Sequence, residues 1–368
     1  MDKPSGIFRT TAFLLSITIT VYGIIIAREF LYPIAFGFLL AYLLFPIANF
    51  LEMNRVPRIL AILISIILAI IVIGSVFTFF YEQLTNLLDD FSTLKKKALR
   101  NIDTLQVSIQ NLLNVEAMQI ESFLKQQISN FFDTGGGKIG DFFSTTTGTI
   151  FRIAILPVYI FLFLYYRTKF AYFILKMVPN NNKQTAINVL RDISTIATSY
   201  MGGVAIVVLI LCGLNSLGLT IIGVKYPLFF GIASAFFNFI PYFGTLMGGA
   251  VPLLFVLLTS VNPGPDALRV IILYMIIQFT ENNILTPNIV GGNVKLNPFF
   301  IIIGLVLGAT IWGIPGMLVI VPSMAIVRII FSHTEKYKPL AFLLGPGGTK
   351  KHSLSLKKIK HLITLRKK

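Results

Sequence analysis

One carboxylate stands inside an otherwise apolar stretch of the chain. Glu281 lies there with three amide side chains close to it, those of Gln278, Asn282 and Asn283. A carboxylate at membrane depth is costly unless it is paired or faces water, so it indicates a pathway for a solute or an ion. The alternative is that Glu281 already lies among lipid headgroups, because the apolar run ends a few residues later.

Two long apolar runs, Tyr226–Ser260 and Pro298–Ile330, are each interrupted near the middle by proline and glycine. Proline removes a backbone donor, and glycine lets two backbones approach closely. Backbone groups released at membrane depth can be satisfied only by protein or by a water-filled cavity. Paired interruptions of this kind point to the binding site of a transporter. The candidate pathway residues in and after these breaks are Pro241, Tyr242, Gly244, Pro287, Gly313, Pro315 and Gly316.

Each long run could be one kinked helix or a re-entrant hairpin. A straight helix over Tyr226–Ser260 would be about 52 Å long, well beyond a hydrocarbon core of about 30 Å. We expect two hairpins that enter the membrane from opposite faces, with tips near the midplane. Two kinked spanning helices remain the alternative.

These candidate residues must be positioned by membrane helices, because the composition leaves no other choice. The chain has 368 residues, of which 55% are hydrophobic and 12% are charged, against about 25% charged residues in soluble domains. We therefore predict an all-α polytopic membrane protein. Its eight apolar segments are Thr11–Ala27, Phe30–Phe50, Ile59–Tyr81, Ile150–Tyr166, Met201–Val224, Tyr226–Ser260, Ala267–Leu285 and Pro298–Ile330.

The net charge of +16 bears on orientation. Lysine and arginine gather before the first segment, after the second and fourth, and in the C-terminal tail, which places both termini in the cytoplasm. We interpret the first segment as an uncleaved span rather than a signal peptide. The tail is expected to bind anionic lipid headgroups. Nucleic-acid binding is not expected of so apolar a chain.

The predicted organisation has four parts: three spans over residues 1–81, an extracytoplasmic insert over 82–148, a transport core over 149–331 and a basic cytoplasmic tail over 332–368. The insert contains an amphipathic helix, read from apolar residues at three- and four-residue steps, and a second, weaker one. It is either a helical cover or a gate or subunit contact. A short cytoplasmic amphipathic helix is predicted after Pro179, before the fifth span. The apolar residues that predict the first insert helix are Leu84, Leu87, Phe91, Leu94, Ala98, Ile102, Leu105, Ile109 and Leu112. Those of the second insert helix are Met118, Phe123, Leu124, Ile128 and Phe131, and those of the cytoplasmic helix are Ile187, Leu190, Ile193 and Ile196.

Enzyme chemistry has no support in the sequence. Cys212 is the only cysteine, and the three histidines lie in the C-terminal region. The run Gly135-Gly136-Gly137-Lys138 lacks the spacing of a phosphate-binding loop. We therefore expect no catalytic residues, no metal site and no bound cofactor.

The motif residues resemble those of a known family, the autoinducer-2 exporter (AI-2E) family of bacterial permeases. The resemblance covers roughly Phe8 to Phe331 and is most specific between Phe237 and Pro322. It rests on Ile240-Pro241-Tyr242 with Gly244, on Glu281-Asn282-Asn283-Ile284-Leu285-Thr286-Pro287, and on Gly291, Leu296-Asn297-Pro298-Phe299, Gly308-Ala309, Gly313, Gly316-Met317 and Pro322.

This resemblance implies an oligomeric secondary transporter of the bacterial cytoplasmic membrane. The expected function is export of a small polar solute similar to the quorum-sensing molecule autoinducer-2. One alternative is a sodium or potassium/proton antiporter. Another is a scaffold for envelope or sporulation machinery that transports nothing.

Overall fold

The computed structural model describes residues 6–113, 122–134, 154–241, 243–290 and 296–346. Every regular element in these ranges is helical, which confirms the predicted all-α fold. The main helices are α1 (Gly6–Ile26), α2 (Arg28–Met53), α3 (Arg58–Asp89), α4 (Phe91–Leu113), α7 (Leu156–Met177), α8 (Lys183–Ile222), α9 (Pro227–Phe237), α10 (Phe243–Thr259), α11 (Pro263–Thr280), α12 (Pro298–Trp312), α13 (Ile314–Ser332) and α14 (Lys338–Leu344). A π-helical segment (Glu281–Val290) continues α11, residues 122–134 are helical, and short 3-10 turns precede α8 and α14.

Six helical stretches in the described part are long and apolar enough to cross a membrane. They comprise α2, α3, α7, α8 with the turn before it, α11 with its π-helical continuation, and α13. Shorter apolar helices lie in α1, α9, α10 and α12. The chain is therefore a multi-pass membrane protein.

The chain forms two compact units, which are described separately. The first contains Met1–Phe173 and Ala197–Gly292, and the second contains Ile174–Ile196 and Asn293–Lys368. Helices α7 and α8 run from one unit into the other.

Helices α2, α3 and α7 of the first unit share an apolar cluster that contains Leu44 and Ile62. A half-buried ion pair joins α7 to α2 at one end of this group, with Arg167 Nη2 at 2.6 Å from Glu52 Oε2. Arg58, at the start of α3, donates to a backbone carbonyl of α7 at 2.7 Å.

The chain reverses between α9 and α10, so Tyr226–Ser260 is a helical hairpin, called here the first hairpin. Near the open end of the hairpin, the ring centroids of Phe230 and Phe255 are 4.5 Å apart. Near the turn, a Cβ added to Gly244 would lie 2.1 Å from the Phe237 carbonyl oxygen. The earlier residue of α9, Phe230, meets the later residue of α10, Phe255, while Phe237 meets Gly244, so the two arms are antiparallel. The kinked-helix alternative is wrong for this run.

The lengths of the two arms favour a re-entrant arrangement. Helix α9 has 11 residues and α10 has 17, which correspond to about 16 and 26 Å. A hydrocarbon core of about 30 Å is too thick for α9 to cross alone. That the α9 arm ends at membrane depth and the chain turns back there stays a prediction, which these lengths favour.

The second unit contains a hairpin of the same kind, formed by α12 and α13 and called the second hairpin. A Cβ on Gly316 would lie 2.0 Å from the Gly308 carbonyl oxygen, and one on Gly304 would lie 2.5 Å from Met324 Sδ. Gly308 of α12 faces Gly316 of α13, while the earlier Gly304 faces the later Met324, so α12 and α13 are antiparallel. Pro298–Ile330 is thus also a hairpin rather than one kinked helix.

Helix α8 differs from the sequence-based expectation. A short amphipathic helix separate from the fifth span was predicted, but α8 is one continuous helix of 40 residues, about 60 Å long. No proline lies within it, and the apolar spacing of the amphipathic stretch continues into the span. Nothing in the local sequence therefore ends the helix at the membrane boundary.

Helices α3 and α7 also extend past their predicted ends. The third span was expected to end at Tyr81, but α3 continues to Asp89. Helix α7 reaches Met177 and includes Arg167 and Lys169, which were expected to follow the span. Lysine and arginine are good helix formers, so the change from apolar to charged residues does not end a helix.

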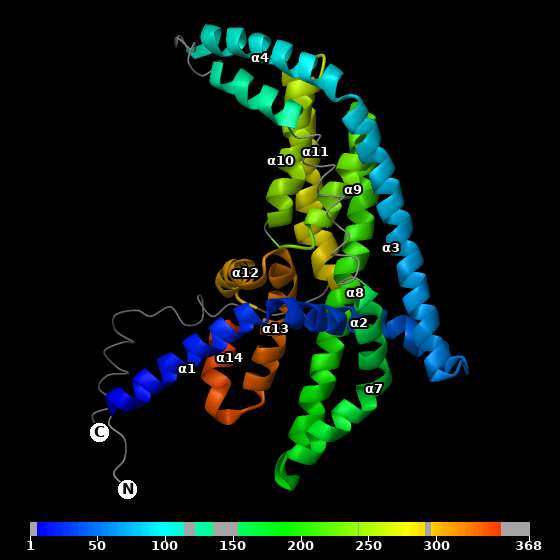
Figure 1. Ribbon diagram of the computed structural model, residues 1–368, viewed down its shortest axis with the longest axis vertical. Helices are drawn as coiled ribbons and strands as arrows, with labels where there is room; N and C mark the ends of the chain where they lie inside the picture. The colour runs from blue at the N-terminus through cyan, green and yellow to red at the C-terminus, as the bar shows by residue number, and fades with distance from the viewer. Residues whose placement is uncertain (1–5, 114–121, 135–153, 242, 291–295, 347–368) are drawn as a thin grey trace. The chain divides into compact units, whose positions relative to one another are not determined.

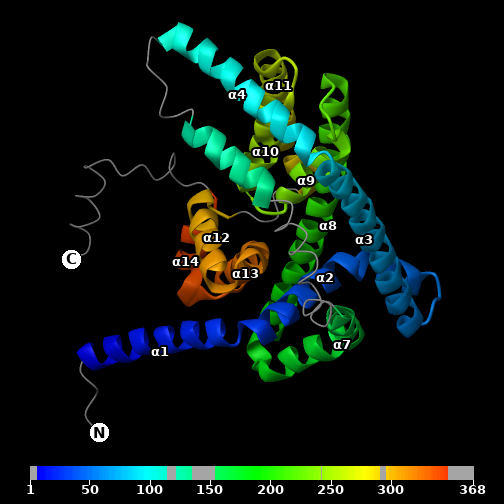
Figure 2. The same cartoon turned by 45° about the horizontal axis from the view of Figure 1, so that its top comes forward.

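The insert packs against the first hairpin through α4, which is amphipathic as predicted. Leu94, Ala98 and Ile102 are buried on one face of α4, and α4 lies across the end of α10 (Figure 1, Figure 2). On the same face, the Asn101 side-chain amide donates to the Ser260 carbonyl at 2.8 Å. It therefore satisfies one of the carbonyls that a helix C-terminus leaves unpaired.

A second contact joins the insert to the base of the first hairpin. Asp90, between α3 and α4, accepts hydrogen bonds from Lys225 and from the Tyr226 hydroxyl. The hydrogen bonds from Lys225 and Tyr226 lower the pKa of Asp90. The hydrogen bond to Asp90 in turn raises the pKa of Lys225. The second predicted insert helix is present over residues 122–134 and packs Phe132 on Phe91. Met118, also assigned to it, lies outside the described residues.

The glycine contacts of the second hairpin give a stability prediction. Gly316→Ala places a methyl group against backbone that cannot move without separating the arms, so it should destabilise the protein by about 1–3 kcal/mol. Thermal unfolding of the purified protein in detergent measures this. Gly213→Ala is the matched control, because a Cβ there has nothing within 4 Å. Equal melting temperatures for the two variants would contradict the packing role.

Candidate functional site

Helices α9 and α11 each carry a line of small or polar residues at helical spacing. Gly231, Ser234 and Asn238 follow one another along α9, while Tyr274, Gln278 and Glu281 do so along α11 and its continuation. Steps of three and four residues place each set on one face of its helix. The two helices are neighbours of α10 in the same unit (Figure 1). We call this pair of lines the polar seam.

Asn238 and Glu281 meet in the seam. The Asn238 side-chain amide donates to Glu281 Oε2 at 2.9 Å, and both side chains are half-buried. Within the described residues, no lysine, arginine or histidine forms an ion pair with Glu281. The carboxylate is therefore held by a neutral donor and keeps its charge available for a proton, a cation or a hydroxyl group.

One turn earlier along α9, a second pair of side chains crosses the seam. The Ser234 and Tyr274 hydroxyl oxygens are 2.8 Å apart. Ser234 also lies 2.5 Å from the Gly248 carbonyl of α10, to which it donates. Because Ser234 pairs with Tyr274 and Asn238 pairs with Glu281, α9 and α11 run parallel at this point.

Glu281 lies where α11 changes into the π-helical segment Glu281–Val290. Pro287 lies inside this segment and cannot supply a backbone donor, which favours a departure from the α-helical ladder. Such π-helical turns occur frequently at functional sites. The segment packs closely on α8, where a Cβ on Gly203 would lie 2.8 Å from the Val290 Cα.

The other predicted residues of this segment are exposed, apart from Gln278, which is half-buried. Gln278 donates to the Asn282 side chain at 3.1 Å, and Asn283 donates to the Phe279 carbonyl at 2.8 Å. Asn282, Asn283 and Pro287 are all exposed. The predicted amides therefore surround Glu281 along the helix, but only Gln278 lies on the line of the seam.

The turn of the first hairpin is more closed than the sequence suggested. The backbone amides of Phe239, Ile240 and Gly244 all donate to carbonyls within the turn. Gly244 is buried against α9, Pro241 is half-buried, and Tyr242 lies outside the described residues. Among the described residues of the turn, the polar group open to a ligand is the side chain of Asn238 rather than free backbone.

In the second unit, Gly313, Pro315 and Gly316 form the turn of the second hairpin. Gly313 adopts a φ of 68°, in the left-handed region that glycine enters without strain. Pro315 lies at the start of α13, and Gly316 is buried against Gly308. These three residues make the reversal possible. That both hairpin turns contribute to one site stays a prediction.

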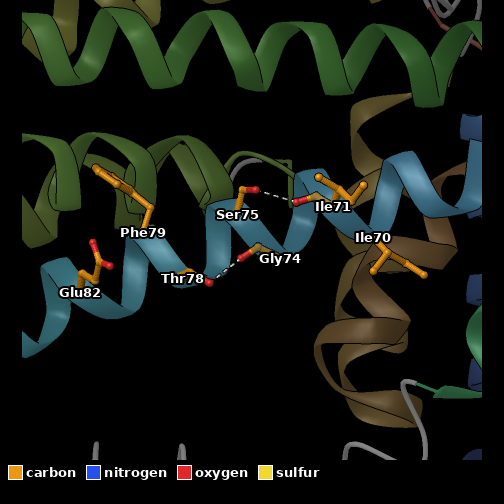
Figure 3. A pocket seen from close by; sticks show the side chains of 7 residues that line it. All are labelled: Ile70, Ile71, Gly74, Ser75, Thr78, Phe79 and Glu82. Carbon is orange, nitrogen blue, oxygen red and sulfur yellow. Dashed lines mark hydrogen bonds between the residues drawn. The ribbon is translucent and has the colours of Figure 1, made fainter.

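A hollow on α3 is a separate feature of the first unit (Figure 3). Gly74, Ser75, Thr78 and Glu82 line it together with apolar side chains. The hydroxyl groups of Ser75 and Thr78 donate to carbonyls one turn back on the same helix, at 2.8 and 2.9 Å. Their hydrogen-bonding capacity is largely used within α3, so the polar seam is the stronger candidate.

Sequence reasoning found Glu281 and missed its partners. Asn238 lies in the run before Pro241, and Ser234 and Tyr274 each stand within an apolar helix. The available signal was their spacing, because Ser234 and Asn238 are four residues apart, and Tyr274 and Glu281 are seven apart. Such spacing shows that the residues share one face of a helix, but it does not show which other helix packs against that face.

Comparison with known proteins supports the resemblance seen in the motifs. The sequence model of the AI-2E family transporters matches residues 14–336. YrrI of Bacillus subtilis is 26% identical over 355 residues, which cover 90% of this chain and 98% of YrrI. The AI-2 transport protein TqsA of Escherichia coli is 24% identical over 335 residues, 89% of this chain and 93% of TqsA. A second Bacillus subtilis relative, YueF, is 24% identical over 84% of this chain and 85% of its own length.

Proposed function

The chain belongs to the AI-2E family of membrane transporters, and on this premise we propose that it exports a small polar solute similar to autoinducer-2. Export would run across the bacterial cytoplasmic membrane as secondary transport. The contact between Asn238 and Glu281 carries the proposal. In this contact the carboxylate lies on a polar line between helices of an apolar unit and has no basic partner among the described residues, and an ionisable group in such a place indicates a pathway.

The chemistry of the seam limits the cargo. It offers the carboxylate of Glu281, the amides of Asn238 and Gln278, and the hydroxyls of Ser234 and Tyr274. Amides and hydroxyls both donate and accept, which suits a neutral solute rich in hydroxyl groups. A negative carboxylate repels anions. The seam therefore favours neutral or cationic cargo.

A cation/proton antiporter is the second candidate. Its supporting observation is again Glu281, because a carboxylate without a basic partner can exchange a proton for Na⁺ or K⁺. A flux assay separates the two candidates by testing both kinds of cargo.

We further propose that both termini are cytoplasmic and that the first hairpin enters from outside. The basic residues near the ends of α2 and α7 support this orientation. Residues 347–368 lie outside the described part, so the proposed contact of the basic tail with anionic lipid rests on its charge. A homo-oligomeric assembly remains a proposal from the family resemblance.

The function is tested by flux in proteoliposomes that contain the purified protein. An autoinducer-2-type furanone and the cations Na⁺ and K⁺ are offered separately over a pH series. Glu281→Gln keeps the shape and the acceptor oxygen for Asn238 but removes the charge, so cargo flux should fall about tenfold or more, because the seam loses the group that can bind a proton or a cation.

The matched control is Glu82→Gln, which removes another carboxylate of an apolar helix, outside the seam. Its flux should equal that of the wild type. Wild-type flux by Glu281→Gln at every pH would show that Glu281 is structural. Absence of flux for every cargo in the wild type would instead support a scaffold.

Orientation is tested with single cysteines in a background that lacks Cys212. Position Asn262, before α11, should react with an impermeant thiol reagent in intact cells. Position Glu335, after α13, should react only after the membrane is opened. Labelling in intact cells at Glu335 but not at Asn262 would reverse the proposed orientation.

A further inference from the structure

A cavity of about 230 Å³ lies where the insert meets the base of the first hairpin, and it is called here the junction cavity. Lys97 of α4 lines one side, and the connection between α8 and α9, with Lys225, lines another. The end of α10 and the start of α11 contribute Ser260 and Asp266. Figure 1 shows α4 crossing the end of α10 at this junction. No residue of the polar seam lines the cavity, so it is a separate feature.

The charges around the junction cavity do not balance. Lys225 forms an ion pair with Asp90. Asp266 pairs with Arg269, whose Nη1 lies 2.7 Å from Asp266 Oδ1. Lys97 forms no ion pair with a carboxylate of the described residues. These three basic side chains therefore face two carboxylates, and the charge of Lys97 is left unmatched.

Lys97 and Lys225 act on the same carboxylate. The hydrogen bond that Lys225 donates lowers the pKa of Asp90, and the charge of Lys97 lowers it further. Two ammonium groups that line one cavity repel each other, and the single charge of Asp90 cannot neutralise both. An anion between the two lysines would remove this repulsion.

The helix ends beside the cavity do not supply the missing negative charge. Helices α8 and α10 both end here, and a helix C-terminus carries partial negative charge on its unpaired carbonyls. The Asn101 amide donates to the Leu258 and Ser260 carbonyls at 3.0 and 2.8 Å. The backbone amides of Gly223 and Val224 donate to carbonyls in the last turn of α8. These carbonyls are therefore already engaged within the protein.

The remaining lining of the cavity is apolar. Ile222, Phe255 and Val256 line it, and they belong to the apolar cluster that the insert shares with the hairpin. Such a surface favours a hydrocarbon group over water. The volume of about 230 Å³ equals that of roughly seven waters at about 30 Å³ each. The cavity is therefore large enough for a short-chain solute in place of water.

We propose that the junction cavity binds a small organic anion, a carboxylate with a short hydrocarbon chain. The carboxylate accepts hydrogen bonds from the ammonium groups of Lys97 and Lys225, and the chain lies against Phe255 and Val256. An ammonium group has three donors, so Lys225 keeps its bond to Asp90 while it contacts the ligand. The bound anion joins α4 to the base of the first hairpin. This site goes beyond the proposed transport and does not depend on it, because the seam disfavours anions.

Binding is measured by calorimetry on the purified full-length protein in a non-ionic detergent, at neutral pH and constant ionic strength. Pentanoate, pentylammonium and pentanol carry the same chain with a negative, a positive and a neutral head group. Pentanoate should give a saturable heat and raise the melting temperature, whereas the other two should do neither. Acetate should bind at least tenfold more weakly than pentanoate, because it lacks most of the chain that contacts the apolar lining.

Lys97→Gln removes the unmatched charge at an exposed position, so the protein should fold and bind pentanoate at least tenfold more weakly. Lys96→Gln is the matched control. Lys96 is the neighbouring exposed lysine of α4 and does not line the cavity, so this variant loses the same charge elsewhere. It should bind pentanoate like the wild type.

Absence of a saturable pentanoate signal in the wild type would overturn the proposal, and so would unchanged binding by Lys97→Gln. Binding of pentylammonium as tight as that of pentanoate would reject the assigned charge of the ligand. Equal losses in Lys97→Gln and Lys96→Gln would show a general attraction to the basic surface of α4 and would also overturn the site.

Discussion

The backbone contacts at glycine control how the two hairpins are built. A side chain at Gly244 would collide with the end of α9, and one at Gly316 would collide with α12. With side chains at these positions the arms could not lie at backbone distance. In an apolar medium there is little hydrophobic gain from bringing helices together, so close packing at small residues supplies the stabilisation.

The reversal of the first hairpin has a direct consequence for the polar groups. Because α10 returns the chain to the base of α9, the next helix, α11, starts again in the direction of α9. Polar residues on two parallel helices then face each other in the same order, Ser234 with Tyr274 and Asn238 with Glu281. Each of these four side chains forms a hydrogen bond with a side chain of the opposite helix. The polar seam is therefore stable between two apolar clusters, one of which includes Val270 and the other Ile277.

Much of the fold could be predicted from the sequence because it depends on local patterns. The apolar runs predicted the membrane helices, and proline with glycine predicted the two reversals. Glu281 stood out because a carboxylate is rare in such a run. Asn238, Ser234 and Tyr274 could not be assigned in the same way, since a polar residue in an apolar helix gains its meaning from the helix that packs against it. The helix boundaries predicted at Tyr81 and before Met201 were wrong because hydropathy marks where lipid ends, whereas helices end where a cap, a proline or a glycine stops them.

The central claim is that the line through Asn238 and Glu281 is a water-accessible path through an apolar protein. The most direct measurement is the reaction rate of a small hydrophilic thiol reagent with Asn238→Cys in a background that lacks Cys212. Leu254→Cys on α10 serves as the lipid-facing comparison, because Leu254 is 57% exposed on an apolar helix. The account predicts that Asn238→Cys reacts at least tenfold faster and that cargo slows the reaction. Equal, slow rates at the two positions would show that the seam is dry and only structural.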